Sequence, residues 1–402
     1  MTSYDIVLYG ATGFTGRLVA AYLASHPGRG TFSWAIAGRD PEKLRKLRAS
    51  LIADHDAAPG IVLARTSDFN SVSAMVSQTR VVLTTAGPYS AYQGRSLIER
   101  CAKAGRDYAD LSGEYWFQRE MIDEFHSEAQ RTGAKIVLGA GVDSIPSDLG
   151  TQFAIEQLEE LGVSAARVKV LFTDYSGSFS GGTHKTLKAI ATLPKSGRYD
   201  DDFHRDPYVL TPETEFESDG ESVTGWDHLR FDRDFKKLGG PFFMAPINAR
   251  IVRRSLSLGK RLPCRYEEGI AAIAWLKAAW LWASRGFGYF VGQPIPFRPK
   301  SGQGPPAWLR RAGKFRLLIK AISGTGDSWV KVEVKGRGDP GYGATSKMFA
   351  EVGLCLLLER NKLSAKGGVL TPATALGPAL RERLITVQGG EFMQFRLLEK
   401  SK

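Results

Sequence analysis

The chain has 402 residues and a net charge of +12, and 43% of its residues are hydrophobic and 24% charged. This composition argues against a disordered or fibrous protein and, at this length, predicts two domains. The three widely spaced cysteines, Cys101, Cys264 and Cys355, argue against a disulfide framework and a metal site, and they fit a reducing compartment.

The first 140 residues alternate short apolar strands with helices, and no secretory signal precedes the first strand, so we expect a cytoplasmic protein. Strands are expected at Asp5–Tyr9, Phe32–Ala37, Ile61–Ala64, Val81–Thr85, Asp107–Leu111 and Lys135–Leu138. Helices are expected at Phe14–Ser25, Pro41–Leu51, Arg95–Ala104 and Ile122–Arg131. This alternation predicts βαβ units and an α/β fold with a parallel sheet.

The pattern changes after about residue 150. Strands are expected at Arg167–Phe172 and, as an antiparallel hairpin, at Phe315–Ile322 and Ser328–Lys335. Residues 195–240 read as long loops and residues 296–311 as a connector, because both are rich in proline and polar residues. Helical periodicity returns at Ala344–Arg360.

A glycine-rich turn links the first strand to the first helix. It contains Gly10, Thr12, Gly13, Phe14, Thr15 and Gly16. Glycines at this position permit a tight turn and let the backbone approach a pyrophosphate, which the helix N-terminus then stabilises. The turn predicts a dinucleotide site; a structural turn without a ligand is the alternative.

The end of the second strand indicates which nucleotide binds. Arg39 follows this strand and can hold a 2′-phosphate with its planar guanidinium, which favours NADP(H). Asp40 offers the competing interpretation, since a carboxylate there binds the ribose of NAD. Asp68 follows the third strand and either flanks the adenine or caps a helix. Ala86, Gly87 and Pro88 follow the fourth strand and are expected beside the nicotinamide.

Several common catalytic motifs are absent from the sequence. None of the 13 tyrosines is followed four residues later by lysine, so the proton-donating pair of the short-chain dehydrogenases is missing. A zinc-protease motif, a P-loop and a nucleophile elbow are missing as well.

Eight blocks of sequence together resemble the saccharopine dehydrogenase-like oxidoreductases, and most closely their trans-acting enoyl reductase branch. They are Tyr4–Gly16, Ala37–Arg39, Val82–Tyr89, Cys101–Glu114, Gly139–Leu149, Ser180–Thr183, Ala245–Arg254 and Gly367–Ala373. The resemblance implies a Rossmann-type domain at residues 1–150, completed by a helical segment at 341–385. It also implies an inserted α+β substrate domain with an antiparallel sheet at 151–340.

The resemblance further implies reduction of a double bond conjugated to a thioester on a lipid or polyketide-like chain, in lipid or glycolipid assembly. Catalytic candidates are Tyr89, Asp143, Ser144 and His184, which are expected near the nicotinamide. Each has a structural alternative: aromatic packing for Tyr89, turn formation for Asp143 and Ser144, and an ordinary paired polar residue for His184. Two other functions stay open: a lipid-associated NADPH-binding protein with little turnover, and a saccharopine-type, imine-forming dehydrogenase.

The basic excess is concentrated in one part of the chain. Residues 251–320 contain fourteen lysines or arginines and two glutamates, so their net charge equals that of the whole chain. Within this region, residues 269–292 are apolar and rich in tryptophan, interrupted by Lys277 and Arg285. We expect this segment to dock on a membrane or lipid droplet without crossing it. A core helix and a homodimer interface are the alternatives, and we expect no nucleic-acid partner.

Overall fold

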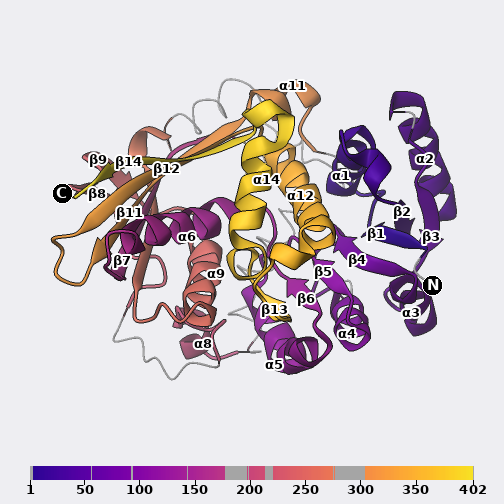
Figure 1. Ribbon diagram of the computed structural model, residues 1–402, viewed down its shortest axis with the longest axis horizontal. Helices are drawn as coiled ribbons and strands as arrows, with labels where there is room; N and C mark the ends of the chain where they lie inside the picture. The colour runs from indigo at the N-terminus through magenta and orange to yellow at the C-terminus, as the bar shows by residue number, and fades with distance from the viewer. Residues whose placement is uncertain are drawn as a thin grey trace.

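The computed structural model describes residues 3–55, 57–91, 94–142, 144–176, 197, 199–212, 221–274, 276 and 304–401. Within these ranges the strands form two seven-stranded sheets, called sheet A and sheet B below. In Figure 1 sheet A lies at the right and sheet B at the left. Between them lie helices α6 (Ile145–Glu159), α12 (Thr345–Leu358) and α14 (Gly377–Gly390).

Sheet A is parallel throughout, with the strand order β13-β6-β5-β4-β1-β2-β3. Its strands are β1 (Tyr4–Tyr9), β2 (Trp34–Gly38), β3 (Gly60–Leu63), β4 (Thr79–Thr84), β5 (Asp107–Ala109), β6 (Lys135–Val137) and β13 (Gly368–Leu370). The predicted α/β fold with a parallel sheet is confirmed. From β1 the chain adds β2 and β3 on one side and then crosses to add β4 on the other side, so the strand order reverses between β1 and β4. Ligands of such sheets bind at the carboxyl ends of the strands at this point.

Helices connect the strands of sheet A. They are α1 (Phe14–Ser25), α2 (Pro41–His55), α3 (Phe69–Ser77), α4 (Gly94–Ala104) and α5 (Tyr115–Thr132). Two differ from the expectation. Helix α3 was not predicted. Helix α5 begins at Tyr115 and not at Ile122, because Tyr115–Phe117 are three consecutive buried aromatic residues, which hide the amphipathic pattern of its first turn.

Sheet B is mixed, with the order β14-β12-β11-β7-β10-β9-β8. Its strands are β7 (Ala165–Ser176), β8 (Arg230–Asp232), β9 (Lys237–Gly240), β10 (Arg265–Ala271), β11 (Lys314–Ser323), β12 (Trp329–Arg337) and β14 (Met393–Lys400). Among the described strands of sheet B, only β7 and β10 pair in parallel. The predicted β11–β12 hairpin is confirmed, and its Val330, Val332 and Val334 are buried on one face.

Part of the loop prediction for residues 195–240 is wrong. The region contains the short helix α8 (Asp201–Arg205) and the two strands β8 and β9. These strands are too short, and too rich in charged residues, to show an alternating pattern in the sequence. The remaining described helices are α9 (Ala245–Leu258), α11 (Ala307–Ala312) and α13 (Pro372–Ala375), with short 3-10 or π turns at Arg29–Thr31, Pro340–Ala344 and Arg360–Lys362.

The C-terminal segment packs against both sheets. Helix α12 contacts α1 and β4, and it fits closely because a Cβ at Gly353 would lie 2.6 Å from Leu83. Strand β13 extends sheet A beside β6, whereas β14 returns to sheet B beside β12. Helix α14 contacts α12, α6 and β14. The division into two domains stays a proposal, with the last strand of the chain added to sheet B.

A buried carboxylate fixes α12 to its neighbours. Glu351 accepts hydrogen bonds from Tyr22 at 2.7 Å, from His26 at 3.1 Å and from two nitrogens of Arg383 at 2.7 and 2.9 Å. Burial alone would raise the pKa of Glu351, but these partners, with His26 first, hold it below its ordinary value. The charged carboxylate therefore links α1, α12 and α14.

Candidate functional site

The glycine-rich turn after β1 has the geometry of a dinucleotide loop. Gly10 adopts a φ of +77°, which disfavours a side chain. A Cβ at Gly16 would lie 2.3 Å from the Gly10 carbonyl oxygen, so this position must be glycine for the turn to close. A Cβ at Gly13 would meet only that same oxygen, at 3.2 Å. Gly13 therefore has space on its outer side, where a ligand can approach the backbone.

The N-terminus of α1 is suited to bind an anion. Gly13 is its N-cap residue and provides no side-chain cap, and the first turn contains no acidic residue. Its backbone N–H groups therefore have no side-chain acceptor from the cap or from the first turn. Thr12, Phe14 and Thr15 are half-buried, and Arg17 donates to the Thr12 carbonyl at 2.8 Å. The turn thus fits the pyrophosphate of a dinucleotide.

The structure assigns different positions to the two charged residues after β2. Asp40 accepts a hydrogen bond from the Lys43 backbone N–H at 3.1 Å and pairs with the Lys43 ammonium at 3.3 Å. This backbone hydrogen bond is the main reason that the pKa of Asp40 is below its ordinary value. Arg39 is exposed and forms no ion pair with any described residue. Asp40 therefore serves the start of α2, and Arg39 is free to bind a phosphate.

A second free arginine, which sequence reasoning missed, lies beside Arg39. Gly38 and Leu63 are paired at the ends of β2 and β3, and the Ala64 N–H donates to the Gly38 carbonyl at 3.1 Å. Arg39 and Arg65 therefore lie just after the ends of neighbouring strands, at the same edge of sheet A. The Arg65 side chain is exposed and has no ion-pair partner in the described ranges. Its place directly after the third predicted strand was the signal that could have found it.

Asp68 has a structural role in this conformation. It is exposed and caps α3 by accepting a hydrogen bond from the Asn70 N–H at 3.0 Å. This is the helix-capping alternative considered from the sequence. A contact between Asp68 and the adenine stays a prediction.

The loop after β4 lies against the glycine-rich turn. The Thr85 hydroxyl donates to the Gly10 carbonyl at 3.1 Å, and a Cβ at Gly10 would lie 3.0 Å from Ala86. Ala86 and Gly87 are half-buried, whereas Pro88 is buried. The two loops expected to hold the cofactor are therefore in contact at the carboxyl end of β1 and β4.

Tyr89 is not placed to donate a hydrogen bond to a substrate. Its hydroxyl donates to the Thr84 carbonyl at 3.1 Å and accepts from the Leu111 N–H at 3.0 Å. Its ring is buried and stacks on Phe117 with centroids 6.3 Å apart. This geometry favours the packing alternative for Tyr89.

A buried glutamate holds the loop in which Tyr89 lies. Glu114 accepts from the Tyr89 N–H at 2.9 Å, the Ser90 N–H at 3.2 Å and the Ser90 hydroxyl at 2.6 Å. The carboxylate thus ties the loop after β5 to the loop after β4. Sequence reasoning missed this positioning residue, because nothing in the spacing of the two loops shows that a glutamate caps backbone N–H groups.

A second buried carboxylate shapes the loops after β5 and β6. Asp110 accepts from the N–H and hydroxyl of Ser112 at 3.0 and 2.7 Å, from the Gly139 N–H at 3.1 Å, and from the Tyr108 hydroxyl at 3.0 Å. Burial raises the pKa of Asp110 to about 6, although these hydrogen bonds oppose the rise. Asp110 is enclosed and has a structural role.

Ser144 is the catalytic candidate with an available polar group. It is the N-cap residue of α6 and is 1% exposed, and its hydroxyl has no hydrogen-bond partner in the described part of the chain. Its surroundings are closely packed, because a Cβ at Gly139 would lie 3.2 Å from the Ser144 hydroxyl and 3.3 Å from the Gln118 amide nitrogen. The other two candidates, Asp143 and His184, lie outside the described residues.

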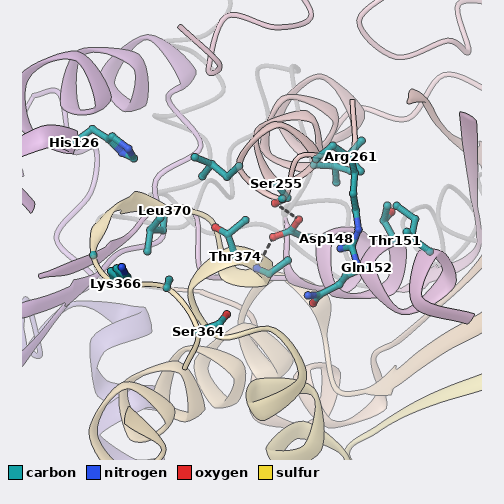
Figure 2. Close-up of a pocket in the computed structure, with 18 of the residues that line it drawn as sticks. His126, Asp148, Thr151, Gln152, Ser255, Arg261, Ser364, Lys366, Leu370 and Thr374 are labelled. Atoms are coloured by element: carbon teal, nitrogen blue, oxygen red, sulfur yellow. Dashed lines mark hydrogen bonds between the residues drawn. The ribbon is translucent and has the colours of Figure 1, made fainter. Parts of the chain in front are cut away.

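A cavity of about 620 Å³ lies one helical turn beyond Ser144, between α6, α9 and the segment around β13. Figure 2 shows Asp148 near its centre, with hydrogen bonds from the Ser255 hydroxyl at 2.5 Å and from the Ala373 N–H at 2.8 Å. Burial raises the pKa of Asp148 to about 7. No residue of the glycine-rich turn lines the cavity. Asp148 therefore links α6, α9 and α13, and this contact lies away from the cofactor loop.

Asp148→Asn is expected to change how stability depends on pH. The folded pKa is about 7 and the ordinary value is 3.8, so the folded state retains a proton that the unfolded chain releases in this interval. The stability contributed by Asp148 therefore falls as the pH rises from about 4 to about 7, by at most about 1.4 kcal/mol per pH unit. Asparagine resembles the protonated form and lacks this dependence.

The melting temperature of both proteins is measured between pH 5 and pH 8, at steps of about half a pH unit. The wild type should lose stability relative to the variant up to about pH 7, and the difference should then stay constant. Asp110 and Glu268 also have raised pKa values, but they are present in both proteins and cancel in the comparison. Parallel profiles over the whole range would contradict the assignment.

Comparisons with known proteins agree with this geometry. Residues 6–137 match the family described as the saccharopine dehydrogenase NADP binding domain. A provisionally named trans-acting enoyl reductase of Mycobacterium tuberculosis is 37% identical over 408 aligned positions, which cover 95% of each chain. A trans-acting enoyl reductase of Mycobacterium ulcerans is 35% identical, again over 95% of both chains.

A solved structure shares the overall fold. It is the apo form of the L-glutamate-forming saccharopine dehydrogenase of Saccharomyces cerevisiae, with a TM-score of 0.54 over 99% of this chain and 100% of that one. The two sequences are 11% identical, so the likeness concerns the fold alone.

Proposed function

Because the chain belongs to the trans-acting enoyl reductase branch of the saccharopine dehydrogenase-like oxidoreductases, we propose that it reduces an α,β-unsaturated acyl thioester. The protein is an NADP-dependent oxidoreductase, and its cofactor is NADP(H). The finer proposal concerns the substrate, a lipid or polyketide-like chain carried as a thioester. The observation that carries it is the 35–37% identity to enoyl reductases along 95% of the chain.

The reaction sets two requirements on the protein. Bound NADPH would supply a hydride to the β-carbon. As the hydride adds, the electron pair of the double bond moves toward the thioester carbonyl, and the α-carbon then takes a proton. A hydrogen-bond donor must stabilise the negative charge that develops on the carbonyl oxygen. Ser144 is the described candidate for this donor, since its hydroxyl lies at the start of α6 and has no hydrogen-bond partner among the residues that the structure describes. Asp143 and His184 stay candidates for the proton donor.

Ser144→Ala tests this role. Loss of a donor to a developing oxyanion lowers kcat by about 100-fold, and we expect a drop of at least roughly tenfold with little change in KM. Ser147→Ala is the control, because Ser147 lies in the same first turn of α6 and is buried like Ser144. Equal effects of both substitutions on kcat would point to a general packing defect and remove Ser144 from the mechanism.

Two other functions make different predictions for the same assay. In a panel of NADPH with enoyl thioesters of different chain lengths, on coenzyme A and on a carrier protein, the proposed reductase consumes NADPH and forms the saturated acyl product. A lipid-associated NADPH-binding protein binds the cofactor without turnover. A saccharopine-type dehydrogenase consumes NADPH only with an amino acid such as lysine and a 2-oxo acid. Turnover restricted to that last pair would overturn the proposal.

The docking of residues 269–292 on a membrane or lipid droplet remains a proposal. The structure describes residues 269–274 and Leu276 of this segment, and the tryptophans at 275, 280 and 282 lie outside the described residues. Among the helices that the structure does describe, none is long and apolar enough to cross a membrane.

A further inference from the structure

The β8–β9 hairpin at the edge of sheet B exposes an apolar face. Phe231 and Leu238 are directly opposite each other in the antiparallel register, so their side chains lie on the same face. Leu229 joins them, because its side chain lies 3.4 Å from the Cβ position of Gly240 on the neighbouring strand. These three side chains are 63%, 45% and 60% exposed, in the order named. Figure 1 places β8 and β9 at the end of the molecule far from β2 and β3.

The opposite face of the hairpin is fixed to the rest of the molecule. Asp232 pairs with the buried Lys169, and a Cβ at Gly239 would lie 2.7 Å from Trp226. At the turn, Phe235 is buried and lies near Lys169. The hairpin is therefore anchored, and its exposed leucines and phenylalanine are held in place on a rigid support.

The charge around the apolar face is positive. Asp232 and Asp234 lie in the hairpin but are neutralised by Lys169 and Lys320. Arg233 and Lys236 at the turn are exposed, and neither forms an ion pair with the described residues. Asp227 precedes β8 and has no cationic partner in the described ranges. Its carboxylate accepts hydrogen bonds from the hydroxyls of Ser222 and Thr224.

The apolar face continues into the segment after β10. Ala271 pairs with Gly239, so the chain that leaves β10 passes beside Leu238. Ile273 and Leu276 follow at once and are 53% and 58% exposed. The exposed side chains of the hairpin thus adjoin the first residues of the apolar segment at 269–292.

We propose that the β8–β9 hairpin, with Ile273 and Leu276, is a docking surface for a phospholipid bilayer with anionic headgroups. Apolar side chains in a rigid hairpin enter the interfacial region, and the free cations of Arg233 and Lys236 attract anionic lipids. A second copy of this chain fits less well, because a twofold interface on this face would bring the same cations together. The surface extends the docking proposed for residues 269–292 and does not depend on which substrate is reduced.

Vesicle flotation of the full chain tests the surface. The wild type should float with vesicles of phosphatidylcholine and phosphatidylglycerol at low salt, and much less with phosphatidylcholine alone. Phe231→Ser with Leu238→Ser should reduce the recovered fraction severalfold on the anionic vesicles. Arg233→Gln with Lys236→Gln should reduce it at low salt and remove most of its salt dependence.

The matched control is Ile52→Ser with Leu358→Ser, which removes two exposed apolar side chains from other parts of the surface. This control should float like the wild type. All variants should keep the wild-type melting temperature and NADPH affinity, which separates loss of docking from loss of folding or of reductase activity. A wild type that does not float, or a Phe231→Ser/Leu238→Ser variant that floats unchanged, would overturn the proposal. Conversion of a wild-type dimer to a monomer by the same variant, without any flotation, would assign the face to a second copy.

Discussion

Replacing Gly13 with valine is expected to weaken NADPH binding strongly while the chain stays folded. A Cβ at this position meets only the Gly10 carbonyl oxygen, at 3.2 Å, so the turn itself can accept the added carbon after a small adjustment. The branched methyl groups must then point outward, over the free N–H groups of the first turn of α1. That is the space through which a pyrophosphate approaches the backbone.

We expect the affinity for NADPH to fall by roughly 100-fold or more, which corresponds to about 2.8 kcal/mol. A fluorescence titration with NADPH measures this loss, and a thermal melt without cofactor shows whether the fold is kept. Gly16→Val is the contrasting variant, because its Cβ would lie 2.3 Å from the Gly10 carbonyl oxygen and 2.8 Å from the Ala11 Cα. It should lower the melting temperature even without cofactor. Wild-type NADPH affinity in the Gly13 variant would remove the pyrophosphate site from this turn.

The cofactor turn could be predicted from the sequence because its signal is local. A strand, a glycine-rich turn and a helix follow each other within about twenty residues, and each has its own pattern. The parallel sheet was predictable for the same reason, since its strands are short apolar runs between helices. The β11–β12 hairpin was predictable because alternate valines at 330, 332 and 334 show its buried face.

The parts that could not be predicted depend on contacts between distant residues. Glu114 is an ordinary acidic residue in the sequence, and its role appears only when the chain brings the Tyr89 and Ser90 N–H groups to it. The face of the β8–β9 hairpin required a pairing register that two short charged strands do not reveal. Tyr89 shows the converse, because its position after β4 indicated chemistry, while its hydroxyl is occupied by backbone groups of two different loops.

The preference for NADPH over NADH is expected to depend on Arg39 and Arg65 together. Both arginines follow the ends of adjacent strands, β2 and β3, at the cofactor edge of sheet A. Both are exposed, and neither has an ion-pair partner among the described residues. Two guanidinium groups without partners on neighbouring strands create a local positive potential that a 2′-phosphate would neutralise. Asp40 does not compete for the ribose in this conformation, because its carboxylate holds the start of α2.

Arg39→Ala should therefore weaken NADPH by about 1.5–3 kcal/mol, or roughly 10-fold to 150-fold, and leave NADH nearly unchanged. Arg65→Ala should have a similar but smaller effect, and the double variant should bind both cofactors with comparable affinity. Arg45→Ala is the matched control, since Arg45 is an exposed arginine on α2 that pairs with Glu42. All titrations must share one ionic strength, because salt screens exposed charges. Equal losses of NADPH and NADH affinity in the Arg39 variant would show that another group reads the phosphate, and an unchanged Arg65 variant would leave that role to Arg39 alone.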